Sequence, residues 1–221
     1  MTLFLDSASV EDASRAAQLG FVSGITTNPG LIARVLGEKA RGRTPMQNTL
    51  EAVTALCDVF PGVVMAQLTA STPEGREEEA RVYIKSRPGQ VGLKIPSLPE
   101  NFALARRFAV EGIRVGMTTI FSPGQVYLAC EAGAAIVFPY VNRSTRLLGD
   151  GFAIVRQMRA VVDALGSPAQ ILAASIKTPQ EAVDTILAGA HGLTLPLELM
   201  LSLGQHPLSD QSIDEFNQNW S

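Results

Sequence analysis

The sequence predicts a (β/α)8 TIM barrel, and three observations lead to this α/β fold class. Eight short apolar runs recur along the 221 residues, and most of them are rich in leucine or β-branched residues. Segments with helical periodicity separate the runs, as in parallel βα units. Most runs end in a polar residue, which is typical of strands that deliver side chains to one face of a barrel. A doubly wound open sheet is the alternative.

The eight apolar runs are the expected strands, because strands buried on both faces are short and continuously apolar. They cover residues 2–6, 24–28, 63–69, 91–96, 114–119, 135–140, 170–175 and 192–196. Nothing in the sequence is typical of an interdomain linker, so residues 1–221 are expected to form a single barrel domain. The polar stretch 37–47 is expected to be a surface loop.

Helix starts are marked by a capping residue, which proline often follows because its fixed φ suits the first helical position. The first helix is expected after Ser9 and ends at Gly20. Four later starts combine the cap with the proline, at Asn28-Pro29, Thr72-Pro73, Ser122-Pro123 and Thr178-Pro179.

Two more helices are expected in the second half of the chain. Segment 152–165 is apolar on one side and is followed by Gly166, a typical helix stop. After the eighth strand and one short apolar segment, an extra C-terminal helix is expected at about 209–220. Its apolar residues Ile213, Phe216 and Trp220 would pack on the barrel or on a neighbouring subunit.

Composition argues against several classes of function. The net charge is −3 and no run of Lys or Arg occurs, so no nucleic-acid partner is expected. No apolar run reaches the roughly 18 residues of a membrane span and no signal peptide is visible, so we expect a cytoplasmic protein. The only histidines are His191 and His206, and the only cysteines Cys57 and Cys130, so neither a metal site nor a cofactor is predicted.

Polar residues end most of the predicted strands, and in a closed barrel all these ends meet at one face. They are Asp6, Thr26, Thr27, Asn28, Gln67, Lys94, Thr118, Thr119, Tyr140 and Ser175. Asp6, Asn28 and Ser175 would also serve as caps for the turns that follow, and the threonines as ordinary strand residues. Gln67 and Lys94 are harder to explain structurally, because both lie within apolar runs.

Lys94 interrupts the apolar run 91–97, although an ammonium group is costly to remove from water. One explanation is a snorkelling or ion-paired structural lysine. The other is chemical, because burial lowers the pKa of a lysine and the free amine can form a Schiff base with a ketone or aldehyde. Such an imine accepts the electrons released when a C–C bond breaks. Asp6, Tyr140 and a water held by Gln67 and Thr118 are the candidate proton shuttles.

Seven motifs in order resemble the small members of the transaldolase family over nearly the whole chain. They are FLDSA (4–8), GITTNPGLI (24–32), LKIPS (93–97), TTIFSPGQ (118–125), FPYVNR (138–143), ILAASIKTP (171–179) and LTLPLELM (193–200). The resemblance implies a (β/α)8 barrel with Lys94 as the Schiff-base lysine on the fourth strand. It also implies that Asp6 and Asn28, with Thr27 beside them, surround the imine. A phosphate pocket is implied near the sixth and seventh strands.

Two positions resemble one branch of that family, the fructose-6-phosphate aldolases. Transaldolases look alike in having a glutamate on the third strand and tend to have a phenylalanine on the sixth, where this chain has Gln67 and Tyr140. Glutamine can hold a water but cannot take its proton at neutral pH, and a phenol can supply the missing proton transfer. The motif TTIFSPGQ, in contrast, is more similar to the small transaldolases.

The phosphate is expected to bind Arg143, Ser175 and Lys177. Arg143 follows the sixth strand and offers a planar guanidinium fork. Ser175 and Lys177 precede a helix start, whose backbone N–H groups also favour an anion. Without the resemblance, Lys177 would equally be an exposed loop residue.

The leading hypothesis is a class I aldolase that cleaves or forms the C3–C4 bond of a ketose phosphate such as fructose 6-phosphate, with dihydroxyacetone as donor unit. The alternative is a transaldolase of the pentose phosphate pathway, which moves that unit between sugar phosphates. A remote alternative is a non-catalytic phosphosugar-binding barrel, which would keep Arg143 and Ser175 without needing Lys94. The expected partners are sugar phosphates and aldehydes, and the resemblance implies a homo-oligomer, either a pentamer or a decamer.

Overall fold

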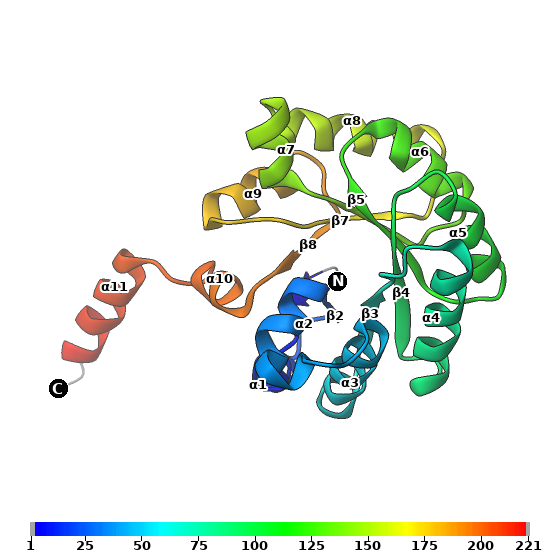
Figure 1. The fold of residues 1–221 in the computed structure, drawn as a ribbon. Coiled ribbons are helices and arrows are strands. Elements are labelled where there is room, and N and C mark those ends of the chain that lie inside the picture. The colour runs from blue at the N-terminus through cyan, green and yellow to red at the C-terminus, as the bar shows by residue number, and fades with distance from the viewer. Residues whose placement is uncertain (1–2, 220–221) are drawn as a thin grey trace.

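The computed structural model describes residues 3–219, and their eight parallel strands close into a barrel (Figure 1). The first strand pairs with the last as well as with the second, so the barrel prediction is confirmed and the open sheet is excluded. The strands are β1 (Leu3–Asp6), β2 (Gly24–Thr26), β3 (Val63–Gln67), β4 (Val91–Pro96), β5 (Val115–Ile120), β6 (Ile136–Pro139), β7 (Gln170–Ala173) and β8 (Gly192–Leu195).

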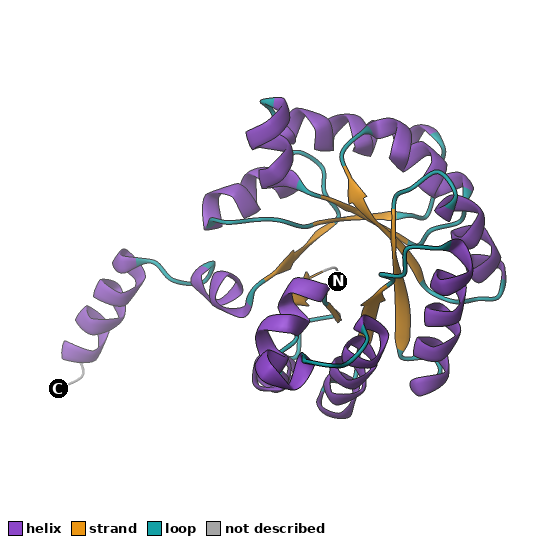
Figure 2. Ribbon diagram, in the orientation of Figure 1, coloured by secondary structure: helices purple, strands orange, loops and turns teal. Residues whose placement is uncertain are grey.

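Helices cover the outside of the barrel, except for the C-terminal helix, which projects away from it (Figure 2). They are α1 (Val10–Leu19), α2 (Pro29–Leu36), α3 (Pro45–Val59), α4 (Pro73–Ser86), α5 (Asn101–Val110), α6 (Pro123–Glu131), α7 (Val141–Leu148), α8 (Gly151–Ala164), α9 (Pro179–Leu187), α10 (Leu197–Ser202) and α11 (Pro207–Gln218). The predicted caps are confirmed: the side chains of Ser9, Asn28, Ser122 and Thr178 each accept a backbone N–H from the first helical turn.

The structure differs from the sequence prediction in several places: some strands end earlier than predicted, such as β3 at Gln67, and two further differences concern helices. The stretch 37–47 is not a loop throughout, because it contains a short 3-10 helix, Gly37–Ala40, and the first turn of α3. Thr44 and Gln47 form a reciprocal capping box there, a signal that lies within an otherwise polar segment. Helix α7 was not predicted as a separate element, because Tyr140, the residue before its first residue Val141, provides no side-chain cap.

Large apolar side chains fill the inside of the barrel, so the interior is a packed core and not a channel. Phe4, Val63, Met65, Ile136, Phe138 and Leu172 form this inner cluster. The packing requires glycine on neighbouring strands: a Cβ at Gly116 would lie 2.4 Å from the Phe138 ring, and one at Gly92 would lie 2.5 Å from the Met65 sulfur. A second, larger apolar cluster lies between the strands and the surrounding helices.

Strand register decides which side chains meet at the carboxyl ends of the strands. Gln67 on β3 is paired with Lys94 on β4, and Asp6 on β1 is paired with Thr26 on β2. Between β5 and β6 the register shifts after Met117, where Thr119 adopts a left-handed backbone with φ of 58°.

The C-terminal part leaves the barrel after α10, which contacts β1. Helix α11 projects away from the barrel (Figure 1), so the predicted extra helix is confirmed in type and begins two residues before the expected start. Trp220, predicted on its apolar side, lies outside the described residues. No helix within residues 3–219 is both long and apolar enough to cross a membrane.

Candidate active site

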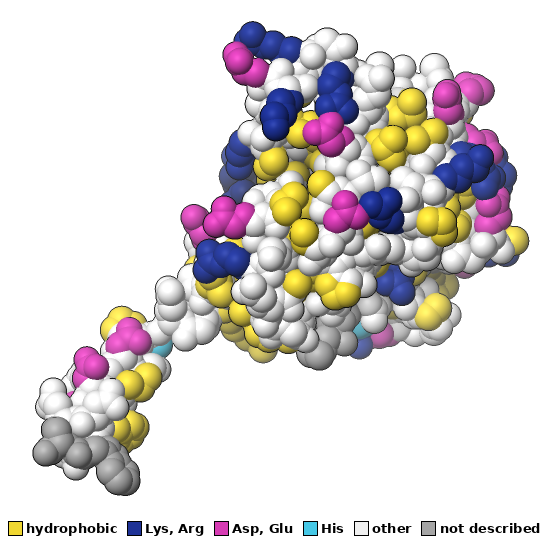
Figure 3. Space-filling view, turned by 90° about the horizontal axis from the view of Figure 1, so that it is seen from below, with side chains coloured by type: hydrophobic (Ala, Val, Ile, Leu, Met, Phe, Trp, Pro, Cys, Tyr) yellow, Lys and Arg dark blue, Asp and Glu magenta, His cyan; other side chains and the backbone are white. Residues whose placement is uncertain are grey.

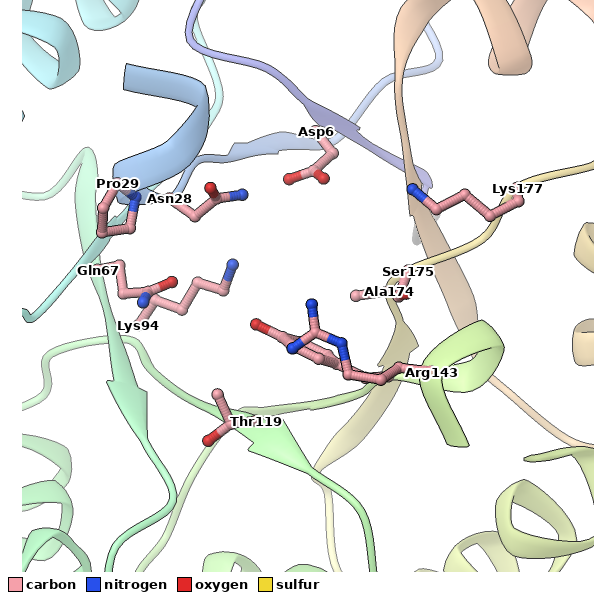
Figure 4. A pocket seen from close by; sticks show the side chains of 11 residues that line it. Asp6, Asn28, Pro29, Gln67, Lys94, Thr119, Arg143, Ala174, Ser175 and Lys177 are labelled. Carbon is pink, nitrogen blue, oxygen red and sulfur yellow. The ribbon is translucent and has the colours of Figure 1, made fainter. Parts of the chain in front are cut away.

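A cavity of about 390 Å³ opens at the carboxyl ends of the strands, the face on which barrel enzymes build their sites. Figure 4 shows Asn28, Gln67 and Lys94 on one side of it and Arg143, Ser175 and Lys177 on the other, with Asp6 between the two groups. Asp6, Asn28, Gln67 and Lys94 are called the amine side below. Arg143, Ser175 and Lys177 are called the cationic side.

Lys94 reaches the cavity from the middle of β4, and the residue is only 3% exposed. Its Nζ donates to the backbone carbonyl of Thr27 at 3.3 Å and lies 5.5 Å from the centre of the Phe138 ring. Burial lowers the pKa of the Lys94 ammonium, and the nearby Asp6 carboxylate opposes this shift in part. The geometry therefore favours the free amine at a lower pH than for an exposed lysine.

Asp6 is held by one threonine, Thr26, which in turn contacts a second threonine, Thr194. Thr26 on β2 donates its hydroxyl proton to the Asp6 carboxylate at 2.8 Å. The Thr26 hydroxyl also lies 2.5 Å from the hydroxyl of Thr194 on β8, on the other side of β1. Both threonines are buried, so the orientation of this carboxylate is determined by the closure of the barrel.

Two buried polar atoms, one on the amine side and one on the residue next to Asn28, have no hydrogen-bond partner among residues 3–219. They are Oε1 of Gln67 and Oγ1 of Thr27. Buried polar atoms are nearly always paired, and an unpaired one indicates a place where a water or a ligand binds. Gln67 lines the cavity, and its acceptor atom is therefore available to a water or to a substrate hydroxyl.

Tyr140 brings a phenol to the cavity from the start of α7. Its hydroxyl lies 3.2 Å from Oγ1 of Thr118, which is fully buried at the end of β5. The ring of Phe121 packs edge-on against Tyr140, with 5.7 Å between the ring centres. The guanidinium of Arg143 lies over the Tyr140 ring, 5.1 Å from the ring centre. These contacts restrict the position of the phenol.

The cationic side is more exposed than the amine side. Arg143 belongs to the first turn of α7, and Lys177 lies in the segment between β7 and α9. Both residues are exposed to solvent, whereas Ser175 is half-buried. Ser175 has a left-handed backbone with φ of 61°, which is uncommon for a residue other than glycine. Two cations at the mouth of one cavity are suited to bind an anionic group.

The geometry agrees with comparisons of the whole chain. Residues 3–221 match the model of the family described as Transaldolase/Fructose-6-phosphate aldolase. The chain belongs to this family.

Curated relatives cover the full chain at similar identity. A probable transaldolase of Symbiobacterium thermophilum is 36% identical over 220 residues, which is 100% of this chain and 97% of that protein. A probable transaldolase of Thermus thermophilus is 35% identical over 221 residues, covering 100% of this chain and 98% of that protein. One from a Caulobacter strain is 36% identical over 221 residues, at 100% and 97% coverage.

Eight of the ten site residues expected from the sequence line the cavity. They are Asp6, Asn28, Gln67, Lys94, Tyr140, Arg143, Ser175 and Lys177. The other two, Thr27 and Thr118, are fully buried behind it and contact Lys94 and Tyr140, respectively. Their roles in a reaction stay predictions. Within the described part of the chain, no group of three or more His, Cys, Asp or Glu side chains could hold a metal ion.

Sequence analysis assigned no role in the site to several residues at this cavity. Pro29, Thr119 and Ala174 line it, and Thr194 holds the Asp6–Thr26 pair from behind. Thr119 is among the polar residues expected at strand ends, but no further signal singles it out for the site. Thr194 carries no local signal, because its hydroxyl meets Thr26 across 168 positions of sequence.

Proposed function

We propose that this member of the Transaldolase/Fructose-6-phosphate aldolase family is a class I aldolase acting on a ketose phosphate such as fructose 6-phosphate. One observation carries the proposal: the amine of Lys94 is buried, has a lowered pKa, and opens into a cavity with two cations opposite. A buried free amine is suited to attack a carbonyl carbon, and the cations are suited to bind a phosphate.

The reaction begins when the Lys94 amine attacks the ketone carbon and water leaves, which gives a protonated imine. Loss of the proton from the C4 hydroxyl then breaks the C3–C4 bond, and the bonding electrons move into the imine to form an enamine. An aldehyde carrying the phosphate departs. Protonation of the enamine carbon and hydrolysis release dihydroxyacetone and restore the amine. Asp6, beside Lys94, is suited to exchange protons during imine formation and hydrolysis.

Gln67 and Tyr140 support the aldolase assignment. The unpaired Oε1 of Gln67 can orient a water, and an amide cannot accept the proton of that water. The Tyr140 hydroxyl, restricted by Thr118 and the neighbouring rings, can exchange the proton of the C4 hydroxyl. In the aldolase reaction the enamine carbon is then protonated and the imine hydrolysed, which releases dihydroxyacetone without a sugar-phosphate acceptor.

Borohydride trapping tests the lysine chemistry. Reduction in the presence of dihydroxyacetone should attach the three-carbon unit to the peptide that contains Lys94, and mass spectrometry of the digest detects it. Lys85, which lies on the exposed side of α4, provides the internal control for non-specific amine labelling. An unmodified Lys94 peptide contradicts the proposal.

A transaldolase is the second candidate, and the names of the full-length relatives favour it. This candidate uses the same imine, but an aldose phosphate accepts the enamine before hydrolysis. Fructose 6-phosphate is therefore incubated with and without erythrose 4-phosphate. Free glyceraldehyde 3-phosphate without the acceptor supports the aldolase, and product formation only with the acceptor supports the transaldolase.

Helix α11 supports a homo-oligomer. Leu208, Ile213 and Phe216 are 65%, 55% and 63% exposed, on a helix that projects from the barrel (Figure 3). In water this apolar surface is stabilised by packing on another chain, and a second copy is the partner implied by the family, as a pentamer or decamer. Light scattering of the full chain measures the oligomer, and removal of residues 207–221 should yield smaller species.

A further inference from the structure

A buried carboxylate outside the proposed reaction joins the two segments that carry the cationic side. Glu181, in the first turn of α9, is 8% exposed. Its Oε2 accepts the backbone N–H of Lys177 at 2.7 Å, and its Oε1 accepts an N–H of the Asn142 side chain at 3.1 Å. Asn142 immediately precedes Arg143 in α7.

We propose that Glu181 is a positioning residue that makes the enzyme selective for phosphorylated over unphosphorylated acceptor aldehydes. It does so by fixing the spacing between Arg143 and Lys177. This inference rests on the proposed function, because it concerns the same phosphate-binding residues.

The backbone around Glu181 supports this role. The N–H of Asn142 donates to the carbonyl of Ser175 at 3.1 Å, and the N–H of Val141 donates to the carbonyl of Ala174 at 3.0 Å. Ser175 is also the residue with the left-handed backbone, which persists only where the surroundings hold it. The two hydrogen bonds of the Glu181 carboxylate therefore add to the backbone bonds that join the start of α7 to the segment before α9.

The Glu181 carboxylate lies in the first turn of α9. It lies at the third position of α9, near a helix N-terminus that favours negative charge. Thr178 caps the same turn by accepting the backbone N–H of Glu181 at 3.1 Å. Because both carboxylate oxygens accept N–H groups of the protein, they are not directed at a bound phosphate.

A second buried glutamate, which holds the segment after Gln67 of the amine side, provides a matched control. Glu79 on α4 is 4% exposed and accepts the backbone N–H groups of Thr69 and Ala70 at 2.7 and 3.0 Å. It also accepts the Thr69 hydroxyl at 2.6 Å. These bonds hold the segment after Gln67. A change at Glu79 therefore perturbs a buried carboxylate of the same kind without contact to the cationic side.

The test uses two acceptors that differ only by phosphate, glyceraldehyde 3-phosphate and glyceraldehyde, with dihydroxyacetone as donor. Glu181→Ala removes both bonds and should raise KM about tenfold for the phosphorylated acceptor, the effect of losing hydrogen bonds to a buried carboxylate. KM for glyceraldehyde and borohydride trapping at Lys94 should change less than about twofold. Glu181→Gln keeps an acceptor for the Lys177 N–H and should restore most of the preference.

Control variants make the outcome decisive. Glu79→Ala should reduce turnover of both acceptors equally and leave their KM ratio unchanged. Asn142→Ala removes one of the two bonds at a half-buried residue and should change the KM ratio in the same direction, which preserves the test if Glu181→Ala does not fold.

Two results overturn the inference, and they are distinguishable from failure of the proposed function. If the wild type prefers the phosphorylated acceptor and both Glu181→Ala and Asn142→Ala keep that preference, Glu181 has no positioning role. If the wild type has no preference although Lys94 is trapped, the phosphate site itself is refuted, and the inference with it. If Lys94 is not trapped, the aldolase proposal fails.

Discussion

The amine side of the cavity is built on strands, whereas the cationic side is built on a helix start and the segment before another. Lys94, Gln67 and Asp6 lie on paired strands, and their positions follow from the register of β1 to β4. Arg143 and Lys177 lie beyond the strands and are exposed. Near them the backbone is left-handed at Ser175, and the Glu181 side chain accepts the backbone N–H of Lys177.

The difference corresponds to the demands of the chemistry. An amine must be desolvated to lose its proton near neutral pH, and only a packed barrel end supplies that environment. A phosphate can bind exposed cations through charge-assisted hydrogen bonds, and exposure lets the substrate enter. Changes on the amine side should therefore abolish the reaction, whereas changes on the cationic side should alter which substrates are used.

The largest effect is expected at Lys94. Lys94→Met keeps the volume and removes the amine, so the aldol rate should fall at least about 10³-fold because no imine forms. Steady-state kinetics and borohydride trapping measure this loss, and circular dichroism checks that the barrel is intact. Substantial activity in a folded Lys94→Met protein would show that the amine side is not required for the reaction.

Tyr140→Phe should have the next largest effect. It removes only the hydroxyl bonded to Thr118, while the ring keeps its contacts with Phe121 and Arg143. Loss of a positioned proton donor should lower kcat about 10²-fold. Trapping of dihydroxyacetone on Lys94 should persist, because imine formation does not need the phenol. Equal loss of trapping and turnover would show that Tyr140 acts earlier than proposed.

Arg143→Ala sharpens the comparison from the cationic side. KM for fructose 6-phosphate should rise about tenfold with little change in the reaction of dihydroxyacetone with glyceraldehyde. The neighbouring exposed cation Arg146, on the same helix but outside the cavity lining, provides the control variant Arg146→Ala. Because Arg143 is exposed, the KM of the wild type should also rise with ionic strength.

Thr194→Val tests whether barrel closure contributes to the amine side. The change removes the hydroxyl that lies 2.5 Å from Thr26, so Asp6 loses support from behind. One such bond contributes roughly 1 kcal/mol, which corresponds to about a fivefold slower imine formation in stopped-flow kinetics. Thr194→Ser keeps the hydroxyl and should behave like the wild type. Identical rates of imine formation for the two variants would show that the Thr194 hydroxyl on β8 does not contribute to the amine side.

The smallest expected effect is the pH dependence of stability. Burial lowers the pKa of Lys94 in the folded state, so the unfolded chain binds more protons between that pKa and the ordinary value of about 10.4. The contribution of Lys94 to stability should therefore increase with pH across this window. Urea unfolding at several pH values should show a smaller increase in the free energy of unfolding for Lys94→Met than for the wild type. An equal increase would show that another group causes the pH dependence.

Sequence reasoning reached the fold and most of the cavity lining for specific physical reasons. Apolar runs interrupted by one lysine, and cap-proline pairs before helices, are local signals that act within a few residues. Lys94, Gln67 and Asn28 were recognisable from such signals. The start of α3 was missed because its capping box lies in a polar stretch, and α7 was missed because it starts without a side-chain cap.

The sequence alone determined the alternation of strands and helices, the helix starts and the presence of an amine that burial would activate, because these depend on neighbouring residues. Only the tertiary structure decided that Thr194 supports Asp6 and that Glu181 joins Asn142 to Lys177. It also decided that Arg143 lies over Tyr140. The contact of Thr194 with Thr26 forms only when β8 pairs with β1, and the contact of Glu181 with Asn142 forms only when two neighbouring βα units pack together.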